Sequence, residues 1–131
     1  MVVPRFIRQA MLSHPITVYG DGEQRRCLTY VDDALDGLIA LALSDKTVGE
    51  IFNIGSHFEI SIKDLAHKIR DLTKSESEIK FISYEQAWPK GVYEDLVYRA
   101  PDLEKIRRYI NYNPRVDLDE ALIRIIAHSE R

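Results

Sequence analysis

The chain has 131 residues, of which 45% are hydrophobic and 30% charged, with a formal net charge of -3 at pH 7. These proportions are ordinary for one soluble globular domain, and the interspersed charges argue against a protein that binds nucleic acid or a membrane surface. The single cysteine, Cys27, excludes an internal disulfide framework and is typical of the reducing cytoplasm. The longest apolar run falls far short of the roughly 20 residues that span a bilayer, and the start lacks a signal-peptide pattern.

The first half of the sequence predicts two helices separated by short strands. Pro4 suits the first turn of a helix, and apolar residues recur at helical spacing to about residue 12. A strand is expected at 16–19, a second extended piece at 26–30, and a helix at about 31–43 whose first turn carries two aspartates. Apolar residues cover more than one face of that helix, which predicts burial on more than one side.

The second half continues the alternation of strands and helices. A strand ending in glycine is expected at 50–55, and the Ser61–Asp64 spacing resembles a capping box that opens a helix over 62–72. A short strand follows at 79–82, whereas 83–100 shows no period and predicts a long ordered loop. Two more helices are expected, one from Pro101 and one capped by Asp117. The fold class is therefore a helix-rich α/β chain with short strands.

Two segments place arginines in distinctive surroundings. Residues 20–33 read GDGEQRRCLTYVDD, so a glycine turn delivers Arg26 just before an acidic helix start. Residues 98–102 read YRAPD, so Arg99 precedes a proline-initiated helix. A guanidinium group offers a planar fork that matches phosphate oxygens bidentately. The alternative for each arginine is a structural ion pair with a carboxylate nearby in sequence, namely Glu23, Asp32 or Asp33 for Arg26 and Asp102 or Glu104 for Arg99.

The order of strand, glycine turn, arginine and acidic helix start, followed by Arg-x-Pro-Asp, resembles the extended short-chain dehydrogenase/reductase family of nucleotide-sugar epimerases, dehydratases and decarboxylases. The resemblance implies that residues 1–131 are the C-terminal, nucleotide-sugar-binding portion of such an enzyme, without its Rossmann half. A full-length parent would use NAD, held by the missing half, and this chain alone would bind no cofactor. Residues 93–95, which read YED, resemble the epimerase and glucuronate-decarboxylase branches.

The same resemblance implies roles for the two arginines. Arg26 would reach the diphosphate of a nucleotide-diphosphate sugar. Arg99 would come back across the site to the same diphosphate or to the ribose. The expected partner of this chain is therefore a nucleotide-sugar, not a nucleic acid or a membrane.

Four further residues are implied as contacts of the nucleoside. Val3 and Phe6 would pack against the base, with ordinary helix core as the alternative for Phe6. Thr17 and Tyr19 lie on a strand that would touch base and ribose, with backbone hydrogen bonds recognising the base.

Catalytic and cofactor-binding groups of this family are not found in the sequence. Gly20 and Gly22 are the only close glycine pair, and the third glycine of a dinucleotide-binding turn is missing. No tyrosine is followed four residues later by lysine, which is the family's acid/base pair. The four histidines are scattered, and none has metal-ligand spacing with Cys27. We therefore assign no catalytic residue and no metal site.

Two functional hypotheses remain at this point. The first is the nucleotide-sugar-binding portion of an NAD-dependent enzyme, inactive on its own. The second is a non-catalytic nucleotide-binding or protein-interaction module, and sequence upstream of Met1 would discriminate them. Under the first hypothesis, Leu35, Leu38, Ile39 and Ala42 are expected to leave an apolar patch that the missing half would partly cover and that favours self-association in its absence.

Overall fold

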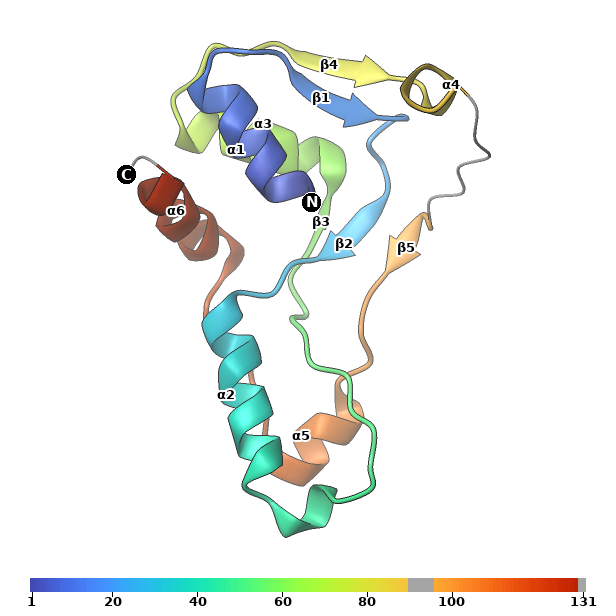
Figure 1. The fold of residues 1–131 in the computed structure, drawn as a ribbon, viewed down its shortest axis with the longest axis vertical. Helices are drawn as coiled ribbons and strands as arrows, with labels where there is room; N and C mark the ends of the chain where they lie inside the picture. The colour runs from blue at the N-terminus through green and yellow to red at the C-terminus, as the bar shows by residue number, and fades with distance from the viewer. Residues whose placement is uncertain (90–95, 130–131) are drawn as a thin grey trace.

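The computed structural model describes residues 1–89 and 96–129 (Figure 1). The described chain is elongated, with strands and several helices gathered at one end and α2 and α5 at the other. The elements in chain order are α1 (Val2–Met11), β1 (Ile16–Tyr19), β2 (Arg25–Cys27), α2 (Val31–Ala42), the 3-10 helix η1 (Asp45–Thr47), β3 (Glu59–Ser61), α3 (Ile62–Leu72), β4 (Ile79–Ile82), α4 (Tyr84–Ala87), β5 (Tyr98–Arg99), α5 (Glu104–Ile110) and α6 (Leu118–Ser129). The predicted helix-rich α/β class with short strands is confirmed.

The first sheet pairs β1 with β4 in parallel, with Ile16 opposite Ile79 and Tyr19 opposite Ile82. Parallel neighbours need a crossover connection, and the chain between these strands includes α3. Helices α1 and α3 lie side by side against one face of this sheet (Figure 1). The main hydrophobic core forms where they meet, as expected for amphipathic helices that cover a sheet.

The main core is built from side chains that recur at helical or strand spacing. α1 contributes Phe6, Ile7 and Ala10, and β1 contributes Ile16 and Val18, all essentially fully buried. Leu65, Ala66 and Ile69 of α3 and Leu122 and Ile126 of α6 complete it. The predicted start of α3 is confirmed, because the Ser61 hydroxyl accepts a hydrogen bond from the Asp64 amide at 3.0 Å.

The second sheet has the order β3-β2-β5, with β2 antiparallel to β3 and parallel to β5. The glycine turn feeds β2 into this sheet, and both of its glycines have positive φ, +68° at Gly20 and +76° at Gly22. The Lys63 amide donates to the Gly22 carbonyl at 2.9 Å, which fixes the turn against the start of α3.

A second, smaller core lies at the α2–α5 end of the molecule. It consists of Leu103, Ile106 and Tyr112, with Phe52 and Ile54 packed against it. The strand predicted at 50–55 is wrong, because this segment packs by its side chains and forms no sheet ladder among the described residues. Asn53 instead donates to the Asp102 carbonyl at 3.2 Å.

The predicted loop at 83–100 is also wrong in part. It contains the one-turn helix α4 and the short strand β5. Ser83 and Gln86 form a reciprocal capping box at the start of α4, a signal that is readable in the sequence as S-x-x-Q. Residues 93–95, which suggested the decarboxylase branch, lie outside the described residues.

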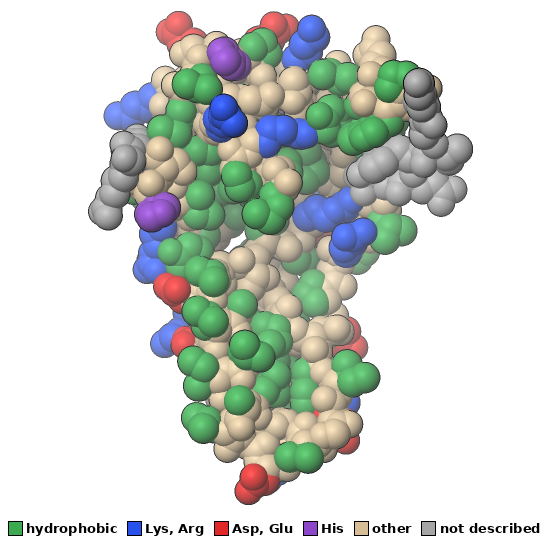
Figure 2. Space-filling model, viewed as in Figure 1, with side chains coloured by type: hydrophobic (Ala, Val, Ile, Leu, Met, Phe, Trp, Pro, Cys, Tyr) green, Lys and Arg blue, Asp and Glu red, His purple; other side chains and the backbone are tan. Residues whose placement is uncertain are grey.

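Helix α2 carries a broad apolar surface that this chain leaves uncovered. Val31, Leu35, Leu38, Ile39 and Leu43 are all about half exposed or more. Figure 2 shows these hydrophobic side chains along the lower left of the molecule, over α2. The predicted burial on more than one side is therefore not reached within the described chain. No described helix is both long enough and apolar enough to cross a bilayer.

Candidate functional site

A cavity of about 940 Å³ opens where α1, β1, β2, α4, β5 and α6 converge. One part of its wall is aliphatic, from residues of α1 and α6 that include Val2, Val3, Leu118 and Ile125. The other part carries cationic and aromatic side chains, which include Arg5, Tyr19, Arg26, Tyr84, Trp88 and Arg99. The cavity therefore combines a large apolar surface with a few polar groups, which is the usual composition of a small-molecule site.

Arg26 and Arg99 are brought together by the second sheet. They are direct register partners in the parallel pair of β2 and β5. Neighbouring strands lie about 4.8 Å apart, and partners at the same register extend from the same face of the sheet. Both side chains line the cavity. Two arginines from segments about 70 residues apart in sequence thus form one cationic wall.

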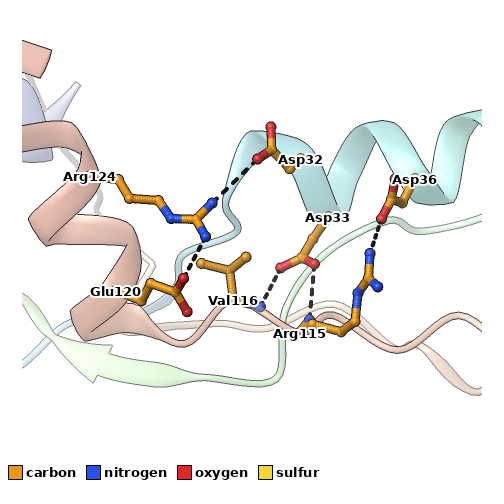
Figure 3. Close-up of polar contacts among 7 residues, drawn as sticks. All are labelled: Asp32, Asp33, Asp36, Arg115, Val116, Glu120 and Arg124. Atoms are coloured by element: carbon orange, nitrogen blue, oxygen red, sulfur yellow. Dashed lines mark hydrogen bonds and ion pairs between the residues drawn. The ribbon is translucent and has the colours of Figure 1, made fainter.

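The Arg26 guanidinium is held by backbone carbonyls. Its Nη1 donates to the carbonyl oxygens of Arg25 at 2.7 Å and Leu96 at 2.8 Å. The carboxylates considered as alternative partners are engaged elsewhere, as Figure 3 shows for two of them. Asp32 pairs with Arg124 at 3.5 Å, Asp33 accepts from the amides of Arg115 and Val116, and Glu23 faces Lys63 at 3.5 Å.

Arg99 is exposed, and it makes no ion pair with any residue in the described part of the chain. Asp102, considered as its alternative partner, instead accepts from the Glu104 amide at 2.9 Å, just before α5. The guanidinium of Arg99 is therefore available to a ligand in the cavity.

Of the four residues expected to contact the nucleoside, Val3 and Tyr19 line the cavity. Phe6 does not, because its side chain is fully buried in the main core and has no surface to offer a base. The core alternative is the correct interpretation for Phe6.

Thr17 also departs from its expected role. The Thr17 amide donates a hydrogen bond to the Gln9 side chain at 3.1 Å, and the Thr17 carbonyl accepts one from Arg5 Nη2 at 3.0 Å. Its hydroxyl accepts from Gln9 Nε2 at 2.9 Å. These bonds tie β1 to α1, so the backbone groups expected to recognise a base at Thr17 are already satisfied by the protein.

Arg5, Tyr84 and Trp88 are among the cavity-wall residues that sequence reasoning missed. Tyr84 and Trp88 lie on or just after α4, in a segment without hydrophobic periodicity, and Arg5 lies on the predicted first helix. The Arg5 guanidinium carbon lies 4.2 Å from the centre of the Tyr19 ring. Only the capping box at Ser83 could have indicated an ordered element here.

Cys27 is a titratable group of the cavity wall with a shifted pKa. Burial, together with the nearby negative charge of Glu59, raises the pKa of the Cys27 thiol. Cys27 therefore remains a neutral thiol at pH 7 and is not an activated nucleophile.

The glycine turn does not fit the pyrophosphate of a bound NAD. The glycine turn is followed by strand β2 rather than by the helix whose N-terminus would hold a pyrophosphate. Its glycines are needed for packing instead, since an added Cβ would lie 2.7 Å from the Tyr84 ring at Gly20 and 2.9 Å from Lys63 Cβ at Gly22. Over residues 1–89 and 96–129, no cluster of side chains is suited to hold a metal ion.

Comparison with known sequences and structures agrees with this geometry. The sequence model of a family described as "NAD dependent epimerase/dehydratase family" matches residues 1–55. UDP-N-acetyl-alpha-D-glucosaminuronate decarboxylase of Bacillus cytotoxicus is 43% identical over 121 residues, covering 92% of this chain and 37% of the relative. UDP-glucuronic acid decarboxylase 1 of Arabidopsis thaliana is 34% identical over 126 residues, covering 96% of this chain and 27% of the relative.

Solved structures match nearly the whole chain. A UDP-glucuronic acid 4-epimerase variant from Bacillus cereus, in complex with a fluorinated UDP-sugar and NAD, superposes with a TM-score of 0.87 at 27% identity. That match covers 99% of this chain and 40% of the epimerase. The Bordetella bronchiseptica enzyme WbmF, in complex with NAD+ and UDP, gives a TM-score of 0.81 at 31% identity, covering 99% and 37%.

The fold is thus that of one part of a short-chain dehydrogenase/reductase epimerase, and the cavity belongs to that part. The chain belongs to the NAD-dependent epimerase/dehydratase family. It spans about a third of the length of the curated relatives it matches.

Proposed function

We propose that this chain is the C-terminal, nucleotide-sugar-binding portion of an NAD-dependent enzyme that acts on a UDP-sugar. The relatives that support this proposal are named as decarboxylases of UDP-glucuronic acid and of UDP-N-acetylglucosaminuronic acid, and as UDP-glucuronic acid 4-epimerase. A UDP-linked sugar acid is accordingly the proposed substrate class of the whole enzyme, and the decarboxylases are the more similar in sequence.

One observation carries the proposal. Arg26 and Arg99 come from different segments, yet they are register partners on the wall of one cavity. Two guanidinium groups side by side match the two phosphates of a nucleoside diphosphate, because each can make paired charge-assisted hydrogen bonds to phosphate oxygens. A surface ion-pair role for both would not require them to share a face.

This chain and the remainder of the enzyme are proposed to have different roles. The residues of this chain supply a clamp for the nucleotide, remote from the sugar carbon that reacts. Binding energy gathered there orients the sugar for groups in the remainder of the enzyme. NAD and the acid/base residues are proposed to belong to that remainder, since the glycine turn of this chain leads into strand β2 and not into a helix that would hold a pyrophosphate.

Calorimetric titration of UDP into the purified chain and its variants tests the clamp. Each charge-assisted contact to phosphate contributes about 1.5–3 kcal/mol, so Arg26→Ala and Arg99→Ala should each weaken binding by about 10- to 150-fold. Replacement by lysine should restore binding only in part, because the fork geometry is lost.

Arg25→Ala is the matched control. Arg25 is the neighbour of Arg26 on β2, does not line the cavity, and pairs with Glu59 on the adjacent strand. Its loss should leave UDP affinity unchanged. If the alanine variants of Arg26 and Arg99 bind UDP as tightly as the Arg25 variant does, the clamp assignment is wrong.

A further inference from the structure

Three aromatic side chains meet at one end of the cavity, where β1 ends and α4 begins. Tyr19 and Trp88 lie edge to face, with ring centres 4.7 Å apart and planes at 65°. Tyr84 and Trp88 are closer to parallel, at 27°, with ring centres 6.2 Å apart. We call Tyr19, Tyr84 and Trp88 the aromatic corner. All three residues line the cavity that holds Arg26 and Arg99.

Polar side chains fix the aromatic corner in place. Gln24 is 8% exposed, and its Nε2 donates to the Tyr19 carbonyl at 3.0 Å and to the Tyr84 hydroxyl at 3.1 Å. The Arg5 guanidinium lies over the Tyr19 ring. Rings held by such contacts are preorganised, so a ligand that packs on them does not have to order them first.

The same corner contains two unsatisfied polar atoms. Gln24 Oε1 and Arg5 Nε are buried and have no hydrogen-bond partner in the described structure. Buried polar atoms are nearly always paired, so each exception calls for an explanation. One unmet acceptor and one unmet donor beside a flat apolar surface match a ligand with an aromatic face and a polar edge.

The aromatic corner lies at a suitable place relative to the arginines. Gln24, which contacts both tyrosines, precedes Arg26 by two residues and lies immediately before β2. Extended backbone advances about 3.3 Å per residue, so the corner begins roughly 7 Å from Arg26 along the strand. A nucleotide whose diphosphate contacts the arginines therefore has its ribose and base within reach of the corner.

We propose that Trp88 is the stacking surface for the base of the bound nucleotide. This inference rests on the proposed function, because it takes the diphosphate to be held by Arg26 and Arg99. Tyr19 and Trp88 already touch, so the base packs against the pair and not between their rings. Trp88 is 37% exposed and retains ring surface for that contact. Trp88 thus positions the ligand and favours nucleotides over inorganic diphosphate.

The fluorescence of Trp88 provides a direct test, because it is the chain's only tryptophan. UDP and inorganic pyrophosphate are titrated separately into the full chain, with binding followed by calorimetry and by tryptophan emission. UDP should change the emission in step with its calorimetric saturation. Pyrophosphate, which has no base, should bind at the arginines and leave the emission unchanged.

Substitutions test the same contact through affinity. Base–aromatic stacking contributes about 5- to 150-fold in affinity, so Trp88→Ala should weaken UDP binding by a factor in that range and leave pyrophosphate binding unchanged. Trp88→Phe keeps a stacking ring and should retain most of the affinity. Because the emission measurement uses the unchanged chain, an unstable Trp88→Ala variant would still leave the proposal testable.

Tyr109→Ala serves as the matched control. Tyr109 has the same exposed fraction, 37%, and also lies edge to face with an aromatic partner, Phe52 at 5.1 Å, but it is outside the cavity. Its removal should change neither affinity.

The outcomes separate the two proposals. UDP binding that depends on Arg26 and Arg99, with no emission change and no loss in Trp88→Ala, overturns base stacking and leaves the diphosphate clamp in place. No binding of either UDP or pyrophosphate overturns the clamp, and the stacking inference falls with it.

Discussion

At the scale of single residues, Asp33 connects two segments that are far apart in sequence. It is 3% exposed, and its two oxygens accept from the amides of Arg115 at 2.9 Å and Val116 at 3.0 Å (Figure 3). A charged acceptor on two backbone donors makes stronger bonds than a neutral one. The carboxylate therefore ties the first turn of α2 to the chain that leads into α6.

We expect Asp33→Asn to lower the free energy of unfolding by about 2 kcal/mol. Hydrogen bonds to charged groups contribute about 1.5–3 kcal/mol each, and the amide would turn an NH2 group toward one of the two backbone donors. Urea denaturation of the chain and the variant measures the difference.

Asp36→Asn is the control for this substitution. Asp36 lies on the same helix and contacts the Arg115 side chain at 2.5 Å, but both side chains are largely exposed. Exposed ion pairs contribute about 0–1 kcal/mol, so its loss should matter little. Equal destabilisation by the two substitutions would contradict the role assigned to Asp33.

At the scale of elements, Gly37 shows how tertiary packing can oppose helix propensity. In an exposed helix, replacing glycine by alanine stabilises by about 1 kcal/mol. In α2, however, an added Cβ at Gly37 would lie 2.8 Å from the Tyr112 ring. That ring is held in place, because the Tyr112 hydroxyl donates to the Gly55 carbonyl at 2.9 Å in the smaller core.

Gly37→Ala is therefore expected to destabilise the chain, by about 1–2 kcal/mol, the usual cost of overpacking. Thermal and urea unfolding measure the effect. In a Tyr112→Leu background the obstructing ring is absent, so the same substitution should become neutral or stabilising. If Gly37→Ala increased stability with Tyr112 in place, the Tyr112 ring would have to move aside at little cost, and the packing argument would be wrong.

The elements that the sequence predicted well are those with a clear apolar pattern. α1, α3, β1 and β4 were all expected close to their observed bounds, because each buries a regular set of side chains. Segment 50–55 has strand-like residues, but a strand also requires a neighbouring strand, and the structure supplies β3 to the sheet instead. Pairing partners are a property of the fold, which local pattern does not contain.

The candidate site was predictable in part for the same reason. Arg26 and Arg99 were identified by resemblance, but their pairing depends on the register of β2 and β5, two strands of three and two residues. Phe6 and Thr17 were assigned to the ligand because their sequence context matched, whereas burial and the Gln9 contacts assign them to the scaffold. Trp88 was missed because its segment has no periodicity to mark it.

At the scale of the whole molecule, the exposed face of α2 is the main feature without a partner. The exposed aliphatic side chains lie along the helix that Asp33 anchors, and they are Val31, Leu35, Leu38, Ile39 and Leu43. A contiguous apolar patch of several hundred Å² exceeds what monomers commonly expose. At about 25 cal/mol per Å² the gain from covering it reaches several kcal/mol.

We therefore expect the chain to self-associate in isolation, most simply as a two-fold dimer in which α2 packs on its counterpart. Sedimentation equilibrium at high micromolar concentration measures this. Leu38→Glu, at a side chain that is 56% exposed, should shift the equilibrium to monomer.

Ile123→Glu is the matched control, since Ile123 is 54% exposed but lies on α6. It should leave the association unchanged. A monomer in the unsubstituted chain would contradict the expectation and would mean that the exposed face of α2 tolerates water.

The Asp33 contact also has a consequence for the order in which the chain is made. Synthesis runs from the N-terminus, and the donors of Asp33 follow it by 82 and 83 residues. At about 5–20 residues per second, a ribosome needs roughly 4–16 s to add them. Throughout that interval the carboxylate must stay hydrated, so α2 is unable to take its final place until residue 116 has emerged. Helix α2 therefore completes its folding only after Arg115 and Val116 have been synthesised.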